Sequence, residues 1–569
     1  MLKKTLEILP KKSRKRFYKT LVLSFCASTL ELLSLSLIVP IIYFIVNPEN
    51  KLLVQIVSFI KVNFNKTSTE EIYNLLIIAL IVIFLLKTFY LSFFIRYQLI
   101  FKRNLRSALA SELFAKYLKL QYVKAIKLGF AEMQKNIDNE THRYSELVLS
   151  YVIMFNEIIM SISIVTFLFL FNFEISLAVL GIFFSIFIVF IFIFKNRFKN
   201  WGIKSQEAYG NYHNTLLQSF NNLREIKLQG KEDFFIYNFS IDNKLKNYFQ
   251  INQRIYSSLP RYFIELVAIL LIFSILFIML KNNYELDHIL ATLGVFAYAC
   301  IRLLPMLNKL IHVIGEIRFL SYATNVISDQ ISFLNTEPSL NARKNYKITD
   351  IDTIELEEIN FSYKRTVLDK LSLTLKKGNI TGLYGSSGAG KTTLLDILSS
   401  LIIPDNGKIL INKKHIDPKS FFWGNSVGYI SQSSDLFNDT IKKNIAFGEL
   451  EKNIDDEKIN YSLKASNLNK FIKELPDGLD TIVGEKGSQI SSGQKQRVNI
   501  ARAFYNDTKI LIMDEATNAI DSENEENIFN DIIKIKENLI VLVVSHDKKL
   551  LNKVCDNIFV LENHNLRKI

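Results

Sequence analysis

Long apolar runs alternate with basic, polar stretches along roughly the first 315 residues of the chain. Six of these runs approach the roughly 20 residues that a helix needs to cross a bilayer. They cover residues 21–46, 72–95, 147–171, 175–194, 262–280 and 286–314. They lack the period-two alternation of a half-buried strand and are longer than a fully buried one, which favours helices. The pattern predicts six membrane-spanning helices, and buried helices of a soluble core are the alternative.

The connections between the spans carry further predictions. Residues 96–146 and 195–261 are far longer than ordinary loops and have helical composition. Because a 25-residue helix rises roughly 37 Å, we expect the neighbouring spans to continue well into the cytosol. Residues 51–62 (KLLVQIVSFIKV) are amphipathic and predict a helix on the outer membrane surface. A short loop helix packed against the spans explains this segment equally well.

Basic residues orient the predicted spans. The N-terminal stretch is strongly basic, with Lys3, Lys4, Lys11, Lys12, Arg14, Lys15 and Arg16. The connections after the second and fourth runs are basic too, whereas those at 47–71, 172–174 and 281–285 are short or charge-balanced. Since cytoplasmic loops carry the excess of Lys and Arg, both termini are expected in the cytoplasm. The first run is too long for a cleavable signal peptide and lacks an early small-residue cleavage site.

Composition excludes several classes of protein. The 569-residue chain is 49% hydrophobic, and its mean hydropathy of +0.17 excludes disorder and collagen-like repeats. Its three cysteines, Cys26, Cys300 and Cys555, are too widely spaced to predict a metal cluster or a disulfide framework. The net charge of +14 could reflect nucleic acid, anionic lipid or cytoplasmic loops. The position of the basic connections favours loops, so no nucleic-acid partner is expected.

The second part of the chain has a different pattern. From about residue 351, short hydrophobic strands such as ITGLYG (380–385), ILIMD (510–514) and LIVLVVS (539–545) alternate with charged helical stretches. This alternation is typical of an α/β domain. We therefore predict a helical six-span transmembrane domain at 1–335, a linker at 336–350 and an α/β domain at 351–569.

A phosphate-binding motif opens the predicted domain. GSSGAGKT (385–392) follows a strand and begins a helical stretch, as the P-loop pattern requires. Its glycines permit a tight backbone wrap whose amides face the phosphates of a nucleotide. We expect Lys391 to reach the β- and γ-phosphates and Thr392 to bind Mg²⁺. The residues predicted to hold ATP here are Gly385, Ser386, Ser387, Gly388, Ala389, Gly390, Lys391, Thr392 and Thr393.

Acidic residues and a histidine follow two other predicted strands. Asp514 ends the strand of ILIMDEAT (510–517), a position that suits the Mg²⁺ shell of P-loop nucleotidases. Glu515 follows it and is the predicted general base for the attacking water. His546 follows the strand before VVSHD (543–547) and is predicted to contact the γ-phosphate. The alternatives are an ordinary acidic helix start and a structural histidine.

ISSGQKQRVNIARAF (490–504) resembles the signature segment of ATP-binding cassette (ABC) transporters, and the other cassette motifs occur in the family's order. GEKGSQ (484–489) resembles the segment that precedes the signature in exporters. Six spans followed by one cassette is the layout of an ABC exporter half-transporter. The resemblance implies that Tyr363 stacks on adenine and that Gln432 contributes to catalysis and the Mg²⁺ shell. It also implies nucleotide contacts by Ser491, Gly493, Gln494 and Asp521.

Three positions depart from the family pattern. Ser492 stands where the signature usually has glycine, Ser431 precedes Gln432 in place of proline, and Asn518 replaces a serine of the D-loop. None of these changes removes a charged catalytic group. We therefore expect ATP hydrolysis to be slower but retained. REIKLQGKEDFF (224–235) resembles the coupling-helix region of exporters.

The resemblance also implies a homodimer. In the family each nucleotide lies between the P-loop of one cassette and the signature of another, and this chain has one copy of each. Two equivalent ATP sites are then expected. Closing and parting of the cassettes would drive alternating access of the spans.

Charged residues within or beside the apolar runs are candidates for the substrate site, because each is costly there unless it is paired. They are Glu31, Lys87, Glu157, Arg261, Glu265 and Arg302. Arg261 and Glu265 can pair as i, i+4 neighbours, whereas Lys87 and Arg302 have no acid nearby in the sequence. If those two cations line a cavity, its wall is positive and suits a phosphate or diphosphate head group.

The spans are similar to those of bacterial lipid-linked oligosaccharide flippases, notably at SSLPRYFIEL (257–266) and IRLLPMLNKLI (301–311). In that resemblance Lys87, Arg261 and Arg302 match cavity cations that guide the diphosphate, although a lysine lacks the bidentate fork of an arginine. The resemblance implies a polyprenyl-diphosphate-linked glycan as the substrate, moved across the inner membrane of a bacterium, with membrane lipids as surroundings. The alternatives are export of a peptide or hydrophobic drug and, from another class, an ATP-gated channel or sensor.

Overall fold

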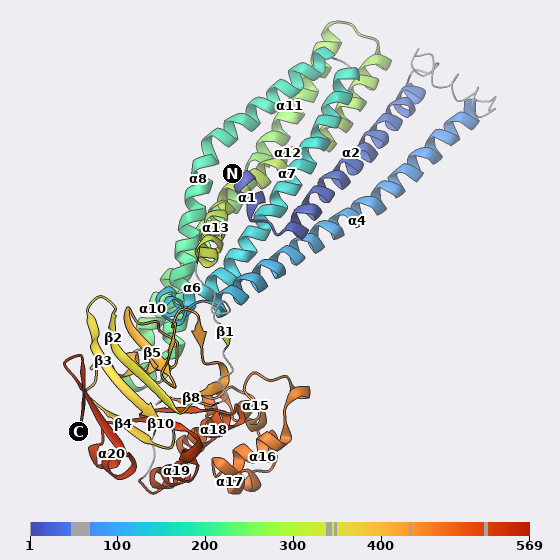
Figure 1. The fold of residues 1–569 in the computed structure, drawn as a ribbon. Helices are drawn as coiled ribbons and strands as arrows, with labels where there is room; N and C mark the ends of the chain where they lie inside the picture. Colours follow the sequence, from blue (N-terminus) through green and yellow to red (C-terminus); the bar gives the residue numbers. More distant parts are fainter. Residues whose placement is uncertain are drawn as a thin grey trace. The chain divides into compact units, whose positions relative to one another are not determined.

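The structure, a computed structural model, describes residues 2–46, 69–171, 173–336, 344–345, 350–431, 435–516 and 522–569. The chain forms two compact units (Figure 1). The first, the helical unit, comprises residues 1–118 and 128–337, and the second, the ATPase unit, comprises residues 119–127 and 338–569. Each unit has its own hydrophobic core.

The helical unit consists of long helices, as the apolar runs predict. Each of the six runs falls inside one of them. The helices are α1 (Leu2–Ile8), α2 (Lys11–Val46), α4 (Thr69–Leu118), α6 (Phe130–Lys135), a π-helical turn η1 (Asn136–Glu140), α7 (Thr141–Phe171), α8 (Phe173–Asn221), α9 (Leu223–Gln229), α10 (Glu232–Ser258), α11 (Pro260–Lys281), α12 (Leu286–Leu320) and α13 (Tyr322–Thr336).

Five helical stretches among the described residues are long and apolar enough to cross a membrane. They are Ile77–Leu118, Phe130–Leu170, Phe173–Asn221, Glu232–Lys281 and Thr292–Thr336. The first predicted run lies in α2, but the side chains of residues 35–46 are outside the described part. A sixth span therefore stays a prediction, and the predicted outer helix at 51–62 also lies outside the described residues.

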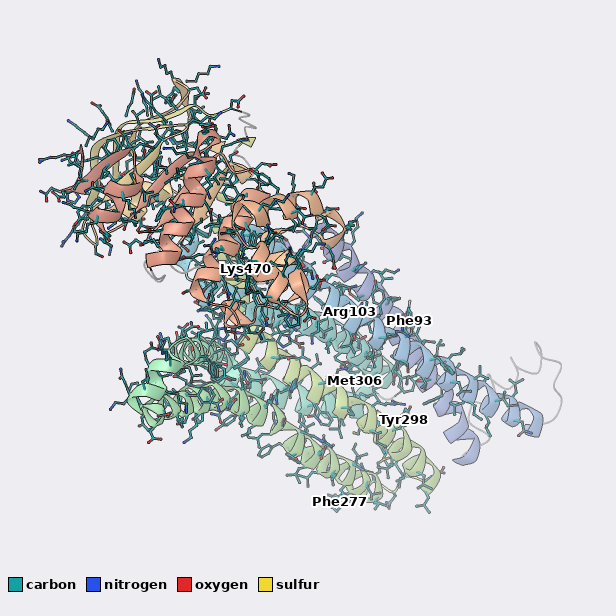
Figure 2. The ribbon with its side chains drawn as sticks, turned by 90° about the horizontal axis from the view of Figure 1, so that it is seen from below. Phe93, Arg103, Phe277, Tyr298, Met306 and Lys470 are labelled. Carbon is teal, nitrogen blue, oxygen red and sulfur yellow. The ribbon has the colours of Figure 1, made fainter. Side chains whose placement is uncertain are left out.

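Apolar side chains lie on both the inside and the outside of this unit. Phe94, Met160 and Phe296 pack in its core, which draws on α2, α4, α7, α8, α11 and α12. On the outside, Phe93 of α4 and Phe277 of α11 are 55% and 67% exposed (Figure 2). A helix that is apolar all round is typical of a membrane span.

The helices continue far beyond the predicted spans. α4 and α8 have 50 and 49 residues, which corresponds to roughly 75 Å each. This confirms that residues 96–146 and 195–261 are largely helical. In this part Arg143 is buried and donates hydrogen bonds to the carbonyl oxygens of Gly202, at 3.2 Å, and Phe319, at 3.4 Å. A Cβ atom on Gly202 would lie 2.0 Å from the Phe319 oxygen, so α8 and α12 approach closely only because this residue is glycine.

The ATPase unit is built on two sheets. The larger has the order β12-β11-β4-β10-β9-β8, in which all neighbours except β11 and β12 are parallel. These strands are β4 (Ile380–Tyr384), β8 (Val427–Ile430), β9 (Ile510–Asp514), β10 (Ile540–Val544), β11 (Asn557–Glu562) and β12 (Asn565–Lys568). The smaller sheet is antiparallel, with the order β3-β2-β5-β6, from β2 (Thr353–Ser362), β3 (Thr366–Lys376), β5 (Asn406–Ile411) and β6 (Lys414–Ile416). β1 (Lys344–Asn345) and β7 (Phe421–Phe422) form a separate pair.

Helices complete the unit around three cores. α14 (Lys391–Leu398) packs in the core that joins the two sheets. The remaining helices are α15 (Ile441–Ile445), α16 (Asp456–Ala465), α17 (Asn469–Glu474), α18 (Ser492–Tyr505), α19 (Ser522–Ile535) and α20 (Lys548–Val554). α15, α16 and α17 form a helical lobe with one face of α18, while the other face of α18 packs on the larger sheet. The α/β domain expected from the strand pattern is therefore present.

One short segment belongs to the ATPase unit although it lies between helices of the other unit in sequence. Residues 119–127, which include most of α5 (Tyr122–Leu128), group with the ATPase unit. Val123 packs against the core that joins its two sheets. The sequence analysis placed all of 1–335 in the transmembrane domain, because a segment this short shows no change of composition.

Candidate functional site

The predicted P-loop follows β4 and leads into α14. Gly385 is buried, and a Cβ atom there would lie 2.8 Å from the carbonyl oxygen of Leu561. Gly390 has φ +104° at the start of α14, a conformation that favours glycine. Lys391 folds over the loop and donates hydrogen bonds to the carbonyl oxygens of Gly385, at 2.7 Å, and Ser386, at 3.1 Å. The loop is therefore a tight cradle that a larger residue at 385 would disturb.

Three predicted residues meet at one edge of the larger sheet. β4, β10 and β9 are adjacent and parallel, so the segments after them emerge at the same edge. Glu515, after β9, lies with Oε1 2.5 Å from Nε2 of His546, after β10. Lys391 Nζ is 3.4 Å from that histidine nitrogen and 3.9 Å from Glu515 Oε1. The arrangement brings a cation, a carboxylate and an imidazole together beside the P-loop.

The backbone holds Glu515 in an unusual conformation. Its φ of +50° is in the left-handed region, which is uncommon for a residue other than glycine. Its backbone N–H donates a 3.0 Å hydrogen bond to the carbonyl oxygen of Val544 on the neighbouring strand. Backbone strain of this kind clusters at functional sites. Here it turns the carboxylate toward His546 and Lys391.

Burial sets the electrostatics of this edge. It lowers the pKa of Lys391, against the attraction of Glu515 and Asp514. It raises the pKa of Asp514, and it raises the pKa of Asp396 to about 6 with a smaller contribution from Asp514. The Tyr429 hydroxyl donates a 2.8 Å hydrogen bond to Asp514 Oδ2 and opposes the rise there. Carboxylates are ligands that Mg²⁺ prefers, and a bound divalent cation would favour their ionised forms against the effect of burial.

Tyr429 was missed by the sequence analysis. It lies in β8, the strand next to β9 in the sheet, three residues before Gln432. An aromatic residue in a buried-strand pattern is usually interpreted as core, so only the order of the strands could have revealed its link to Asp514.

The other P-loop residues differ in exposure. Thr392 is exposed and Thr393 is buried at the start of α14, whereas Ser387 and Gly388 lie exposed in the loop with Ala389 partly buried.

The signature segment lies at the start of α18. The Ser491 hydroxyl accepts a hydrogen bond from the Gln494 backbone N–H, and the Gln494 side chain accepts one from the Ser491 N–H. This reciprocal capping box fixes an exposed helix start around Gly493, and helix N-termini favour anions. α18 packs in the helical lobe and on the larger sheet, not in the core that holds α14.

The remaining predicted nucleotide residues differ in how they are placed. Tyr363 is 56% exposed, and its ring lies edge to face with that of Phe361, with 4.9 Å between the ring centroids. Gln432 and Asp521 lie outside the described residues, as does Asn518. Their predicted contacts with nucleotide therefore stay predictions.

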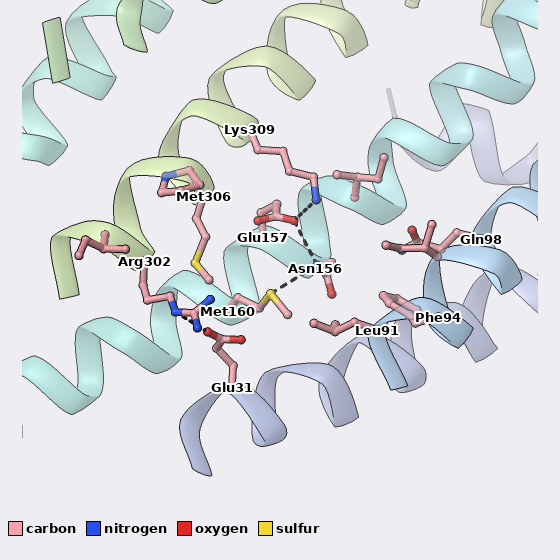
Figure 3. Close-up of a pocket in the computed structure, with 14 residues that line it drawn as sticks. Glu31, Leu91, Phe94, Gln98, Asn156, Glu157, Met160, Arg302, Met306 and Lys309 are labelled. Carbon is pink, nitrogen blue, oxygen red and sulfur yellow. Dashed lines mark hydrogen bonds and ion pairs between the residues drawn. The ribbon is translucent and has the colours of Figure 1, made fainter. Parts of the chain in front are cut away.

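A second candidate site is a cavity of 290 Å³ within the helical unit, between α2, α4, α7 and α12 (Figure 3). Among its lining residues are two acids, two cations and two amides. They are Glu31, Glu157, Arg302, Lys309, Gln98 and Asn156. Polar side chains at this depth of a membrane bundle are functional candidates.

The cations predicted for the substrate site are paired in the structure. Lys87 forms an ion pair with buried Glu31, and Arg302 Nε lies 3.5 Å from the same carboxylate. Arg261 does not line the cavity; it is exposed and pairs with Glu265 at 2.7 Å, the i, i+4 alternative. Lys87 does not line the cavity and Arg302 does, beside Glu31 and Glu157, so the wall of this cavity carries both charges. Glu31 on α2 supplies the opposing negative charge. It is too far from Lys87 and Arg302 in the sequence to be recognised as their partner.

A further ion pair lines the cavity and was missed by the sequence analysis. Lys309 Nζ lies 2.6 Å from Glu157 Oε1, and Asn156 donates a 3.2 Å hydrogen bond to the same oxygen (Figure 3). Lys309 follows Arg302 by seven residues, so both lie on one face of α12 two turns apart. This seven-residue spacing was the sequence signal that could have identified Lys309 as a second candidate.

Comparisons with known proteins agree with this architecture. Residues 368–518 match the ABC transporter family. A "Probable ABC transporter ATP-binding/permease protein" of Haemophilus influenzae is 34% identical over 236 residues, which are 41% of this chain and 42% of that protein. An "ATP-dependent lipid A-core flippase" of Francisella tularensis subsp. holarctica is 28% identical over 421 residues, 72% of this chain and 67% of that protein.

A solved structure resembles nearly the whole chain. A bacterial Atm1-family ABC exporter with ATP bound has a TM-score of 0.73 and 21% sequence identity, over 97% of this chain and 94% of that chain. The two share a fold: a helical region followed by an ABC ATPase domain. The matched segment spans less than half the length of the Haemophilus protein. Together these matches support ATP hydrolysis coupled to transport.

Proposed function

We propose that this chain, which has the fold of an ABC exporter half-transporter, uses ATP hydrolysis to move a lipid-linked anionic molecule across a bacterial inner membrane. The observation that carries the proposal is the meeting of Lys391, Glu515 and His546 beside a P-loop, in a chain whose other half is long apolar helices. A soluble ATPase has no use for such helices. Both termini and the ATPase unit lie in the cytoplasm in this proposal.

The P-loop cradle fits ATP. α14 has no side-chain cap at its start, so its first backbone amides suit the phosphates that helix N-termini favour. Lys391 exchanges two carbonyl acceptors for phosphate oxygens, and Tyr363 stacks on the base. Thr392, Asp514 and Gln432 would hold Mg²⁺, which withdraws charge from the phosphates when it is bound.

Glu515 and His546 handle the attacking water in this mechanism. Glu515 accepts the proton that the water loses, because its carboxylate stands at the sheet edge beside the P-loop lysine. The 2.5 Å contact with His546 orients that carboxylate and keeps the imidazole near the γ-phosphate position. Positioning and charge stabilisation supply most of the rate in such a reaction.

A second copy of the chain would complete each ATP site. The signature at the start of α18 and the P-loop at the start of α14 pack in different cores of the same unit. In the proposed homodimer, the signature of one copy covers the nucleotide on the P-loop of its partner.

The finer proposal concerns the cargo. We propose a polyprenyl-diphosphate-linked oligosaccharide, as handled by flippases of the PglK type. The support is the cavity with Arg302 and Lys309 among the apolar helices, together with similarity over most of the chain to a protein named as a lipid flippase. An anionic head group then finds cations, and its polyprenyl tail stays among apolar side chains.

Two measurements test the proposal. Purified protein in liposomes should translocate defined lipid-linked sugars only with ATP, and unrelated drugs or peptides should not stimulate its ATPase activity. Glu515→Gln should lower ATP turnover by about 100-fold or more while ATP still binds, because the base is lost and the shape is kept. Glu526→Gln, at an exposed ion pair with Lys553, is the matched control. Wild-type turnover in Glu515→Gln would contradict the assigned base.

A further inference from the structure

The charges around the membrane cavity are buried to very different degrees. Glu31 and Glu157 are 2% and 3% exposed, whereas the side chains of Arg302 and Lys309 are 31% and 53% exposed. The carboxylates are thus part of the bundle, and the cations are open to the cavity. A buried carboxylate needs a positive partner, but a half-exposed cation can exchange its partner for another anion.

The contact between Glu31 and Arg302 is incomplete. Glu31 Oε2 pairs with Lys87, but Oε1 has no hydrogen-bond partner among the described residues and lies 3.5 Å from Arg302 Nε. That distance is beyond a normal N–H···O hydrogen bond. Arg302 donates its Nε–H to the Tyr298 hydroxyl instead, at 3.2 Å. A guanidinium has five N–H donors, so Arg302 keeps capacity for an anion that Glu31 does not use.

A polar group beside the second ion pair, Lys309 with Glu157, also has an unsatisfied atom. Asn156 donates to Glu157, but its Oδ1 is buried without a hydrogen-bond partner in the described part of the chain. Pro305, inside α12, has no N–H for the carbonyl oxygen of Ile301, which also lines the cavity. These acceptors suit hydroxyl or amide donors beside an anion. Arg302 and Lys309 are about 10 Å apart along α12, which separates an inner and an outer cationic position.

We propose that Glu31 and Glu157 are exchangeable counter-ions of the substrate site. An anionic head group binds by replacing Glu31 at Arg302 and Glu157 at Lys309, while hydroxyl groups of the cargo reach Asn156. The proposal rests on the proposed function and names the chemistry of its substrate site: a diphosphate linked to a polyhydroxyl group. Charge-assisted, bidentate bonds from Arg302 to phosphate are stronger than its long contact with Glu31.

The proposal makes an unusual prediction, because removing a charge should strengthen binding. In Glu31→Gln the cations Lys87 and Arg302 have no competing carboxylate, so a diphosphate should bind about tenfold more tightly, equivalent to about 1.4 kcal/mol. Arg302→Gln should weaken binding by a similar factor. If Glu31 served only to stabilise the bundle, its loss would weaken binding or leave it unchanged.

The test uses the full chain in nanodiscs of phosphatidylcholine, with geranylgeranyl diphosphate as the probe and its Kd as the readout. Glu526→Gln, at the exposed pair with Lys553 in the ATPase unit, is the matched control and should bind like the wild type. Inorganic diphosphate is the second arm and should bind far more weakly, since it lacks the prenyl chain. Equal binding of the two probes would overturn the lipid-linked part of the inference.

A second variant keeps the inference testable if Glu31→Gln does not fold. Glu157→Gln leaves the Glu31 contacts in place and releases Lys309, so it should also tighten binding severalfold. Tightening by either folded variant supports the inference. If the wild type binds the diphosphate lipid and every folded variant binds it equally or more weakly, this inference is overturned and the proposed function is not. A wild type that binds no diphosphate lipid overturns the proposed substrate class as well.

Discussion

Replacing Tyr429 with phenylalanine removes one hydroxyl from the predicted magnesium site and changes little else. The hydroxyl donates a 2.8 Å hydrogen bond to Asp514 Oδ2, the carboxylate that ends β9. A hydrogen bond to a charged group contributes about 1.5–3 kcal/mol. Both side chains are only partly buried, so water can replace some of the bond and the lower end applies. About 1.5 kcal/mol corresponds to roughly tenfold in an equilibrium constant.

We therefore expect Tyr429→Phe to raise the Mg²⁺ concentration for half-maximal ATPase activity by about tenfold. ATP binding without Mg²⁺ should be unchanged, because Tyr429 does not touch the P-loop lysine. The assay is steady-state ATPase activity over a Mg²⁺ titration at saturating ATP. Tyr461→Phe, an exposed tyrosine of α16, controls for the loss of a hydroxyl elsewhere. An unchanged Mg²⁺ dependence would refute the role of this hydrogen bond.

The same variant should be more sensitive to acid. Burial raises the pKa of Asp514, and the Tyr429 hydroxyl opposes that rise. Without the hydroxyl the pKa is higher, so protonation of the carboxylate begins at a higher pH as acid is added. Only the ionised carboxylate binds Mg²⁺. The ratio of variant to wild-type Mg²⁺ requirement should therefore be larger at mildly acidic than at mildly alkaline pH.

Three further variants test other parts of the structure. Gly385→Ala places a Cβ atom 2.8 Å from the Leu561 oxygen, so overpacking of about 1–3 kcal/mol should weaken ATP binding by tenfold or so, measured by fluorescent-nucleotide titration. Arg143→Met removes hydrogen bonds to two carbonyl oxygens and should lower the free energy of unfolding by about 2–3 kcal/mol, seen as a lower Tm in detergent. Ser492→Gly should raise ATP turnover severalfold without changing Tm. Unchanged ATP binding in Gly385→Ala, an unchanged Tm in Arg143→Met or unchanged turnover in Ser492→Gly contradicts the corresponding argument.

The helices and strands follow from local pattern, and sequence was sufficient to predict them. Each apolar run forms part of a helix, because a run of that length can satisfy its backbone groups only within itself in an apolar surrounding. Similarly, Lys391, Glu515 and His546 each follow a buried parallel strand. Each was assigned a role at the same nucleotide, and the structure brings them together because the parallel strands that they follow are neighbours.

The partners of these residues depend on which elements are neighbours in space, and local pattern does not contain that information. Glu31 pairs with Lys87 across 56 positions of sequence, and Tyr429 reaches Asp514 across 85. Each was visible only as a charged residue in an apolar run or as an aromatic residue in a strand. Residues 119–127 are a third case, since their place in the ATPase unit depends on Val123 packing in a core built from much later sequence.

The structure around Ser492 indicates which property of the signature segment its departure from glycine can affect. A glycine at a helix start is usually explained by backbone freedom, but Ser492 is the first helical residue of α18 and is absent from the positions with positive φ. The capping box of Ser491 and Gln494 forms despite the change, so the helix start is intact. Ser492 is exposed at the start of α18, the segment that the proposed homodimer would place over the partner's nucleotide. We therefore expect any slowing of hydrolysis to arise from crowding in that proposed interface, with the fold of the ATPase unit unchanged.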